Sequence, residues 1–238
     1  MSLKDQTIVI LGGSSGIGLA TAGAAIGEGA RVVITGRTRA TLDAAAAQLG
    51  KEARAAAVDS SDEAAMRELF AGIDHVDHIF ANAGNVVGDA KLKMDIATIR
   101  PAIDVRFWGA VYAAKFGAPK MHAGGSIVLM SGTAAVRPIS GSAVGSAACA
   151  AVEGLARSLA IDLAPIRVNA IRPGLIDTPL IDRFVGERKE SFLKSYAARL
   201  PVKRIGRPEE VADAVLFLMK NGFVTGITLP IDGGGAIS

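Results

Sequence analysis

The chain has 238 residues and a mass of 24.3 kDa, a length that α/β folds often reach as a single domain. Half of the residues are hydrophobic and 21% are charged, a balance that argues against intrinsic disorder. The 26 basic and 23 acidic residues leave a formal charge of only +3 and form no basic block, so we expect no nucleic-acid partner.

The single cysteine, Cys149, cannot form an intramolecular disulfide, and no Cys/His spacing matches a metal site. The apolar run at residues 7–11 is too short for a signal peptide. The uncharged stretch at residues 7–27 contains six glycines, which favours a strand, a loop and a helix over a membrane span. We therefore expect a cytoplasmic protein that has no metal ion and no membrane partner.

Short apolar runs alternate with stretches of helical spacing along the chain. Seven runs are predicted to be strands, at residues 7–11, 31–35, 54–58, 78–81, 126–130, 167–171 and 227–231. This alternation predicts the α/β class, with residues 1–238 as a single Rossmann-like domain. Its doubly wound sheet would have seven parallel strands and helices on both faces, and ligands would bind at the carboxyl ends of the strands.

A glycine-rich segment follows the first predicted strand. Residues 12–18 read GGSSGIG and lead into a helix that we expect to reach about Glu28. Glycines at 12, 16 and 18 permit a tight turn and close approach to a pyrophosphate, and a helix N-terminus offers unpaired N–H groups to an anion. The motif predicts a dinucleotide site, although an ordinary glycine-rich turn also explains the motif taken alone.

Further motifs occur in a fixed order after the later strands. Residues 82–84 read NAG, residues 167–171 read RVNAI before a Pro-Gly pair, residues 207–212 read RPEEVA, and residues 231–234 read IDGG. Together with the loop of the form Gly-x-x-x-Gly-x-Gly, these motifs resemble the short-chain dehydrogenase/reductase family over the whole chain. The loop and the resemblance imply the following cofactor-binding residues: Gly12, Ser14, Ser15, Gly16, Ile17, Gly18, Arg37, Asp59, Ser60, Asn82, Ala83, Gly84, Pro173, Gly174, Ile176 and Thr178.

The end of the second strand bears on the choice of cofactor. Folds that prefer NAD hold the ribose 2′-hydroxyl there with an acid, whereas a 2′-phosphate needs a cation. This chain has Gly36 followed by Arg37, which favours NADP(H). Arg39 is an alternative phosphate contact, and a solvated surface arginine is the alternative interpretation of Arg37.

The acid–base residues of the family are replaced in this chain. The resemblance implies an Asn, a Ser, a Tyr and a Lys four residues after the Tyr. Alignment through residues 150–159 places these positions at Arg106, Gly132, Gly145 and Cys149. Because the only tyrosines, Tyr112 and Tyr196, lie on other segments, the usual proton donor is absent.

Three residues are candidates for a substitute catalytic role. Ser131 could reach a substrate oxygen, Arg106 could stabilise an oxyanion, and Cys149 could act as a thiol. Each has an ordinary alternative, since Ser131 could bond its own strand end, Arg106 could pair with Asp104 or another acid, and Cys149 could be a small buried hydrophobe. The histidines are expected on the side away from the cofactor.

Two functions follow. The first is an NADP(H)-dependent oxidoreductase acting on a small carbonyl, imine or activated double bond by an atypical mechanism, and the second is a catalytically silent NADP(H)-binding or sensing protein. A lyase or isomerase is a lesser alternative. Residues 177–204 are predicted either to cover the substrate or to form a solvated helical pair. The resemblance also implies a homo-oligomer, a tetramer or a dimer.

Overall fold

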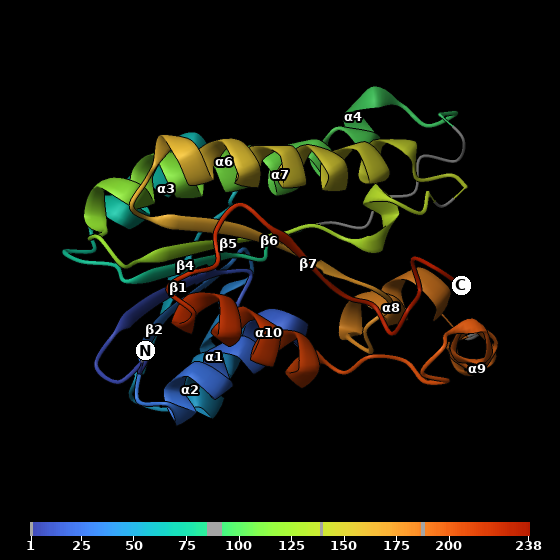
Figure 1. The fold of residues 1–238 in the computed structure, drawn as a ribbon, viewed down its shortest axis with the longest axis horizontal. Helices are drawn as coiled ribbons and strands as arrows, with labels where there is room; N and C mark the ends of the chain where they lie inside the picture. Colours follow the sequence, from blue (N-terminus) through green and yellow to red (C-terminus); the bar gives the residue numbers. More distant parts are fainter. Residues whose placement is uncertain (1, 85–91, 139, 187–188) are drawn as a thin grey trace.

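The computed structural model describes residues 2–84, 92–138, 140–186 and 189–238. These residues form one parallel sheet with the strand order β3-β2-β1-β4-β5-β6-β7 (Figure 1). The strands are β1 Thr7–Leu11, β2 Arg31–Gly36, β3 Ala53–Ala57, β4 His78–Ala81, β5 Ser126–Met130, β6 Arg167–Pro173 and β7 Thr228–Ile231. The predicted doubly wound sheet is therefore confirmed, and its order reverses between β1 and β4.

Helices cover both faces of the sheet. The helices on one face are α1 Gly16–Gly27, α2 Arg39–Leu49 and α10 Pro208–Lys220, and those on the other are α3 Glu63–Ala71, α6 Gly109–Gly117 and α7 Ala143–Asp162. Figure 1 shows the first group below the sheet and the second group above it. Two separate core clusters fill the spaces between the sheet and these layers.

Strand periodicity explains the two clusters. Ile8 and Ile10 of β1 pack in the cluster that includes residues of α1 and α10, whereas Val9 and Leu11 pack in the cluster that includes residues of α3, α6 and α7. Successive side chains of a strand point to opposite faces, so a strand covered on both sides is apolar at nearly every position. This is why the strands read as continuous apolar runs in the sequence.

Four strands differ by one or two residues from their predicted bounds, because the ladder with a neighbouring strand decides where each begins and ends. β3 is shifted by one residue, to Ala53–Ala57. β2 includes Gly36, which pairs with Ala57, and β6 includes Pro173, which pairs with Ile231. β7 begins at Thr228. Proline cannot donate a ladder hydrogen bond, and Pro173 lies beyond the last residue of β6 that pairs with β5, so it interrupts no ladder with that strand.

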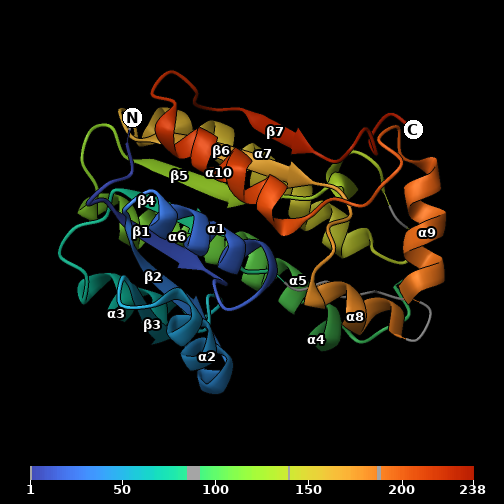
Figure 2. The same ribbon diagram turned by 90° about the horizontal axis from the view of Figure 1, so that it is seen from below.

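Short helices occupy the remaining segments. They are α4 Ile96–Ile99, α5 Pro101–Ile103, the π-helix η1 Asp104–Trp108, the 3₁₀-helices η2 Ala118–Lys120 and η3 Thr133–Ala135, and the helices α8 Pro179–Val185 and α9 Lys189–Arg199. Figure 2 shows α8 and α9 beyond the carboxyl ends of the strands. Residues 177–204 thus contain a helical pair, and α9 has no buried residue.

By length and composition alone, α7 passes the test for a membrane-spanning helix. Core helices of globular domains pass the same test. Ala148, Val152 and Ala156 of α7 are fully buried in this structure, and α7 packs against β5 and β6. Its apolar composition is explained by this contact with the sheet.

Candidate functional site

The glycine loop is folded tightly against the carboxyl end of β4. Gly12 has a φ of +77°, and a Cβ atom there would lie 3.1 Å from the backbone of Ala83. A Cβ atom on Gly18 would lie 2.1 Å from the carbonyl oxygen of Gly12. Both positions therefore require glycine, because any side chain would separate the loop from α1 or from β4.

The N-terminus of α1 lies directly after this loop. The N-cap residue is Ser15, and within the described residues its side chain makes no capping hydrogen bond. The first turn contains no acidic residue. The first N–H groups of α1 therefore have no helical acceptor, and the first turn itself carries no carboxylate, which suits an anionic ligand such as a pyrophosphate.

Asn82 connects the glycine loop to the end of β4, next to the point where the strand order of the sheet reverses. Its Nδ2 donates a hydrogen bond of 2.9 Å to the carbonyl oxygen of Gly12. The loop after β1 and the end of β4 are thereby joined at the point where the sheet order reverses. Ligands of doubly wound sheets bind at this point.

The ends of β2 and β3 carry a cation and an acid. Asp59 accepts hydrogen bonds from the backbone N–H and the hydroxyl of Ser61, at 2.9 and 2.7 Å. Burial raises the pKa of Asp59, but the bonds from Ser61 and the charge of Arg37 outweigh it and hold the pKa below its usual value. At the end of β2, a Cβ atom on Gly36 would lie 3.2 Å from the hydroxyl oxygen of Ser14, so the loop and β2 are in close contact.

The segment after β6 reaches the start of α1. Ile176 is buried and forms an isolated bridge with Gly206. Thr178 follows, and its side chain would contact a Cβ atom on Gly16 at 3.1 Å. The segment after β6 thus lies against the glycine loop. A ligand bound at the loop would therefore be enclosed between the two segments.

Gly174 packs against Asp232, since its Cβ atom would lie 2.9 Å from the Cα of that residue. Thr133 donates to the carbonyl oxygen of Pro173 at 2.9 Å. Ser60 is buried and lies against Gly109 of α6. The predicted cofactor residues accordingly all lie at the carboxyl edge of the sheet or in the segments that continue from it.

Arg106 lies in η1, and its guanidinium faces the backbone. Its Nη1 donates to the carbonyl oxygens of Met130 and Ser131 at 3.0 and 3.1 Å. The same guanidinium lies close to Gly84, whose Cβ atom would be 2.8 Å from Nη2. Asp104, an expected partner of Arg106, pairs instead with Arg100 at 3.5 Å. Arg106 thus places a positive charge between the ends of β4 and β5.

Ser131 belongs to a buried polar network. Its hydroxyl lies 2.8 Å from Oε1 of Glu153 and 3.1 Å from the carbonyl oxygen of Cys149. Arg172 donates to the same Glu153 carboxylate through Nε and Nη2, at 2.7 and 2.9 Å. The single proton of the Ser131 hydroxyl therefore has acceptors within the protein, and the expected bond to its own strand end is replaced by a bond to α7.

Glu153 and Arg172 are functional residues of this network that the sequence did not single out as candidates. A signal was present, because Glu153 is an acidic residue at a core-facing position of an apolar helix, between Val152 and the buried Ala156. An acid at such a position needs a buried partner. Its partner on β6 could not be identified from the sequence, since the two residues are 19 positions apart.

Cys149 is buried, with 6% of its surface exposed. Burial raises the pKa of its thiol and Glu153 adds to this, while Arg106 acts in the opposite direction. Cys149 lies near Gly132, whose Cβ atom would be 3.3 Å from the sulfur, and Gly145 lies one turn earlier on α7. The structure brings the four replaced positions to one edge, and it offers no reactive thiolate there.

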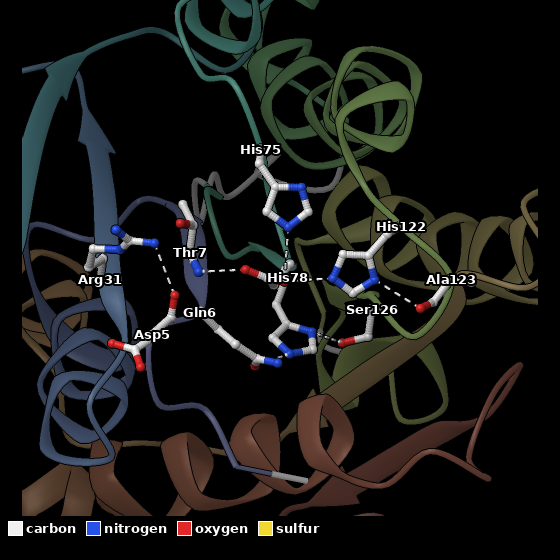
Figure 3. A network of polar contacts seen from close by, with 10 residues as sticks. Asp5, Gln6, Thr7, Arg31, His75, His78, His122, Ala123 and Ser126 are labelled. Atoms are coloured by element: carbon white, nitrogen blue, oxygen red, sulfur yellow. Dashed lines mark hydrogen bonds and ion pairs between the residues drawn. The ribbon is translucent and has the colours of Figure 1, made fainter.

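The histidines lie at the opposite edge of the sheet, as expected. His78 is buried in β4 between Gln6 and Ser126, at 2.9 and 2.8 Å, and burial lowers its pKa to about 4. His75 and His122 lie in the segments before β4 and β5 (Figure 3). None of the three is near the loop at residues 12–18, because the strands run between the two edges.

Comparisons with known proteins agree with this geometry. A family model described as enoyl-(acyl carrier protein) reductase matches residues 12–235. The cis-4-hydroxycyclohexanecarboxylate dehydrogenase of Sinomonas cyclohexanicum is 36% identical over 246 residues, which cover 98% of this chain and 97% of that protein. The NADP-dependent (R)-specific alcohol dehydrogenase of Lentilactobacillus kefiri is 31% identical over 247 residues, with coverages of 98% and 97%.

Among solved structures, the MalC reductase/Diels-Alderase from Malbranchea aurantiaca matches with a TM-score of 0.92 and 31% identity. The match covers 99% of this chain and 98% of that chain. The fold, the glycine loop and these full-length matches together place the chain: it belongs to the short-chain dehydrogenase/reductase family of oxidoreductases.

Proposed function

We propose that the protein is an NADP(H)-dependent oxidoreductase that reduces a small carbonyl, imine or activated double bond without a protein tyrosine as the proton donor. The observation that carries the proposal is an intact dinucleotide loop beside an edge where glycines replace the family's Ser and Tyr. The reduced nicotinamide supplies a hydride when it is bound. The chain's own residues then hold the cofactor and the acceptor in place.

The fit of a dinucleotide rests on the loop itself. Because Gly12 and Gly18 have no Cβ atom, the backbone of the loop lies close to the start of α1. The N–H groups of this first turn are the proposed pyrophosphate ligands. Asp59 and Ser60 would contact the adenine side, and Asn82, Ala83 and Gly84 would line the path to the nicotinamide.

The preference for NADP(H) is supported by charge at the end of β2. Gly36 provides no carboxylate for a ribose 2′-hydroxyl, and Arg37 provides a cation within electrostatic reach of the Asp59 region. A relative from Lentilactobacillus kefiri carries NADP dependence in its name. We assign the 2′-phosphate contact to Arg37, because its charge acts on Asp59 at the end of the neighbouring strand, whereas Arg39 pairs with Asp43 along α2 at 2.9 Å.

The proposed class of hydride acceptor follows from the absence of the family's tyrosine proton donor. Positioned proton transfer typically contributes about 10²- to 10⁴-fold to a rate, so its loss slows hydride transfer without abolishing it. An imine or an activated C=C bond needs less help from a protein acid than a plain ketone does. Arg106, fixed by two carbonyl oxygens, would stabilise negative charge that develops near the ends of β4 and β5.

A second function is favoured by the same buried contacts. Ser131 has acceptors within the protein and Cys149 is a buried thiol, so both are explained as structural residues. A protein of this kind would bind NADP(H) and respond to it without turnover.

The assembly is part of the proposal. Ile161 on α7 is 79% exposed and Phe223 before β7 is fully exposed, so a second copy covering these surfaces would remove apolar area from water. We propose a homo-oligomer, with residues 177–204 covering a small-molecule substrate in each subunit. A sedimentation mass equal to one chain would contradict this assembly.

The first experiment is a titration of the purified protein with NADPH and with NADH, followed by the fluorescence of the reduced nicotinamide. Tighter binding of NADPH is expected. A panel of ketones, imines and enones is then tested for NADPH oxidation, and turnover is expected with an imine or an enone at a higher rate than with a ketone.

The outcomes separate the two functions. Turnover of any acceptor supports the oxidoreductase. NADPH binding that changes the oligomer mass, with no turnover over the whole panel, supports the silent binding protein. If neither nucleotide binds, both functions are wrong.

A further inference from the structure

A second group of polar side chains lies at the amino edge of the sheet. Asp77 immediately precedes β4, His75 lies two residues before it, and His122 lies in the segment between η2 and β5. Because all the strands are parallel, this edge is opposite to the one that carries the glycine loop. Figure 3 shows His75 and His122 converging from the two segments.

The two imidazoles meet at one carboxylate oxygen. Oδ1 of Asp77 lies 3.0 Å from Nε2 of His75 and 2.8 Å from Nε2 of His122. The three atoms all lie within 4.8 Å of one another. The two rings are stacked, with centroids 5.0 Å apart and planes 9° apart. Two nitrogens and one oxygen therefore lie together, and rotation of the exposed rings about their side-chain bonds would turn both nitrogen lone pairs toward one ion.

The hydrogen-bond partners of His122 indicate that a positive species lies between its ring and the carboxylate of Asp77. Its Nδ1 lies 2.8 Å from the carbonyl oxygen of Ala123, which only accepts hydrogen bonds, so Nδ1 carries the proton. In the neutral ring, Nε2 then has a lone pair, and this lone pair faces the carboxylate of Asp77. Two acceptors at this distance repel each other unless a proton or a metal ion lies between them.

The surroundings match those of a metal ligand set. The backbone carbonyl on Nδ1 of His122 is the kind of partner that orients metal-binding histidines. Oδ2 of Asp77 accepts from the N–H of Thr7 at 2.7 Å, which fixes the carboxylate and leaves Oδ1 toward the imidazoles. The Asp77 side chain is 10% exposed, whereas those of His75 and His122 are 47% and 52% exposed. One ligand is thus fixed, and two can adjust and are open to solvent.

The donor set selects the class of ion. Imidazole and carboxylate donors suit zinc, copper and nickel, whereas magnesium and calcium prefer oxygen ligands alone. Bonds of about 2.0 to 2.1 Å in a tetrahedron place the ligand atoms roughly 3.3 Å apart, and the distances of 3.0 and 2.8 Å from Oδ1 of Asp77 to the two imidazole nitrogens are close to this spacing. The two nitrogens lie within 4.8 Å of each other, and rotation of the rings would bring them to the same spacing. The exposed rings can make this movement, and water would complete the coordination.

We propose that His75, Asp77 and His122 form a binding site for one divalent transition metal ion of the zinc type, which joins the segment before β4 to the segment before β5. The site is independent of the proposed function, because it lies at the opposite edge of the sheet from the glycine loop.

The test uses the untagged full-length protein after dialysis against EDTA. Calorimetric titration with ZnCl₂ is expected to give one site per chain, and the melting temperature is expected to rise with zinc but not with an equal concentration of MgCl₂. Substitution of Co²⁺ for zinc is expected to give the visible absorption of tetrahedral cobalt with nitrogen and oxygen ligands.

The variants His122→Ala and His75→Ala are each expected to weaken zinc binding by at least tenfold. Both residues are half-exposed, and circular dichroism checks that each variant is folded. The matched control is Asp74→Asn, which removes an exposed carboxylate from the same segment and is expected to leave zinc binding unchanged. The NADPH titration is expected to be the same with and without zinc.

Three results would each overturn the proposal. One is the absence of a stoichiometric zinc site in the wild-type chain, which would leave protonated imidazoles as the species beside Asp77. Another is unchanged zinc affinity in both histidine variants. The third is magnesium binding as tight as zinc binding, which would exclude imidazole ligation.

Discussion

Arg37 and Arg39 lie two residues apart after β2, yet their charges face different partners. Arg39 pairs with Asp43 one turn later on α2, with both side chains more than half exposed. Arg37 lowers the pKa of Asp59 at the end of the neighbouring strand β3. Of these two arginines, Arg37 is the one whose charge acts on Asp59, at the strand ends where we propose that the adenosine ribose binds.

We expect Arg37→Ala to weaken NADPH binding by at least tenfold, which is about 1.4 kcal/mol, because the contact with the 2′-phosphate is lost. NADH has no such phosphate, so its affinity is expected to change much less. Fluorescence titration of both nucleotides measures the difference.

Arg39→Ala is the matched control, and we expect it to change neither affinity. If NADPH and NADH lose affinity equally in Arg37→Ala, the cation does not recognise the 2′-phosphate. A selective loss in Arg39→Ala would assign the contact to that residue instead.

Single residues at the replaced acid–base positions could be identified from the sequence, but their environment could not. The sequence places Arg106, Gly132, Gly145 and Cys149 at these positions by alignment. That the Arg106 charge is bonded to the carbonyls at the end of β5, and that Cys149 is buried, depends on packing between distant segments.

At the scale of elements, α1 depends on close contact with the loop before it. A Cβ atom on Gly18 would lie 2.1 Å from the carbonyl oxygen of Gly12, well inside van der Waals contact. Gly18→Ala is therefore expected to displace the loop and to weaken NADPH binding by at least tenfold, as measured by the same titration.

Gly23→Ala on the same helix is the control for this prediction. A Cβ atom there meets only Leu49, at 3.8 Å, so the added methyl group fits. It is expected to keep nucleotide affinity and to stabilise the fold by up to about 1 kcal/mol, since alanine is a better helix former. Equal affinities for NADPH in the two alanine variants would contradict the prediction that Gly18 is needed for the tight loop.

A second element-scale prediction concerns the start of α10. Glu210 accepts from the backbone N–H of Arg207 and from Nη1 of Arg204, both at 2.8 Å. The bond from Arg204 is the largest cause that lowers the pKa of Glu210, from 4.5 to about 2. A folded pKa below the unfolded one means that the stabilisation is complete above pH 4.5 and is lost as the pH falls toward 2.

Urea unfolding of wild type and Glu210→Gln checks this sign. Because the pair is solvated, we expect a difference of roughly 1 kcal/mol near neutral pH. The difference should shrink as the pH falls below about 4.5, where the unfolded carboxyl takes up a proton. Glu209→Gln removes a carboxylate from the same turn as a control, and a wild-type advantage that grows in acid would contradict the assignment.

At the scale of the whole molecule, Glu153 connects three elements. Its carboxylate on α7 accepts from Arg172 on β6 and from Ser131 after β5, and the Glu153 and Arg172 side chains are only 9% and 17% exposed. Removing one partner of a buried pair leaves an uncompensated charge.

We expect Glu153→Ala to lower the free energy of unfolding by about 3 kcal/mol, because Arg172 keeps its charge without a partner. Urea denaturation measures this loss. The control Asp43→Ala breaks a surface pair and should cost less than about 1 kcal/mol. A loss of similar size in the two variants would mean that solvent already screens the buried pair.

The sequence by itself determined the fold class and the strand bounds to within a few residues. The seven apolar runs are covered on both faces, so their composition alone identifies them, and the glycines at 12 and 18 are needed for local backbone reasons. Local periodicity and backbone geometry are properties of neighbouring residues, and they can therefore be predicted from the sequence.

Only the tertiary structure decided which polar side chains meet. Glu153 contacts Arg172, and His122 contacts Asp77, which lies 45 positions earlier in the sequence, because parallel strands bring their corresponding ends to a common edge. Such contacts depend on strand order and on the direction of side chains, which no local pattern contains. For this reason the sequence predicted no metal ligands, whereas the folded chain places two imidazole nitrogens and a carboxylate oxygen within 4.8 Å of one another.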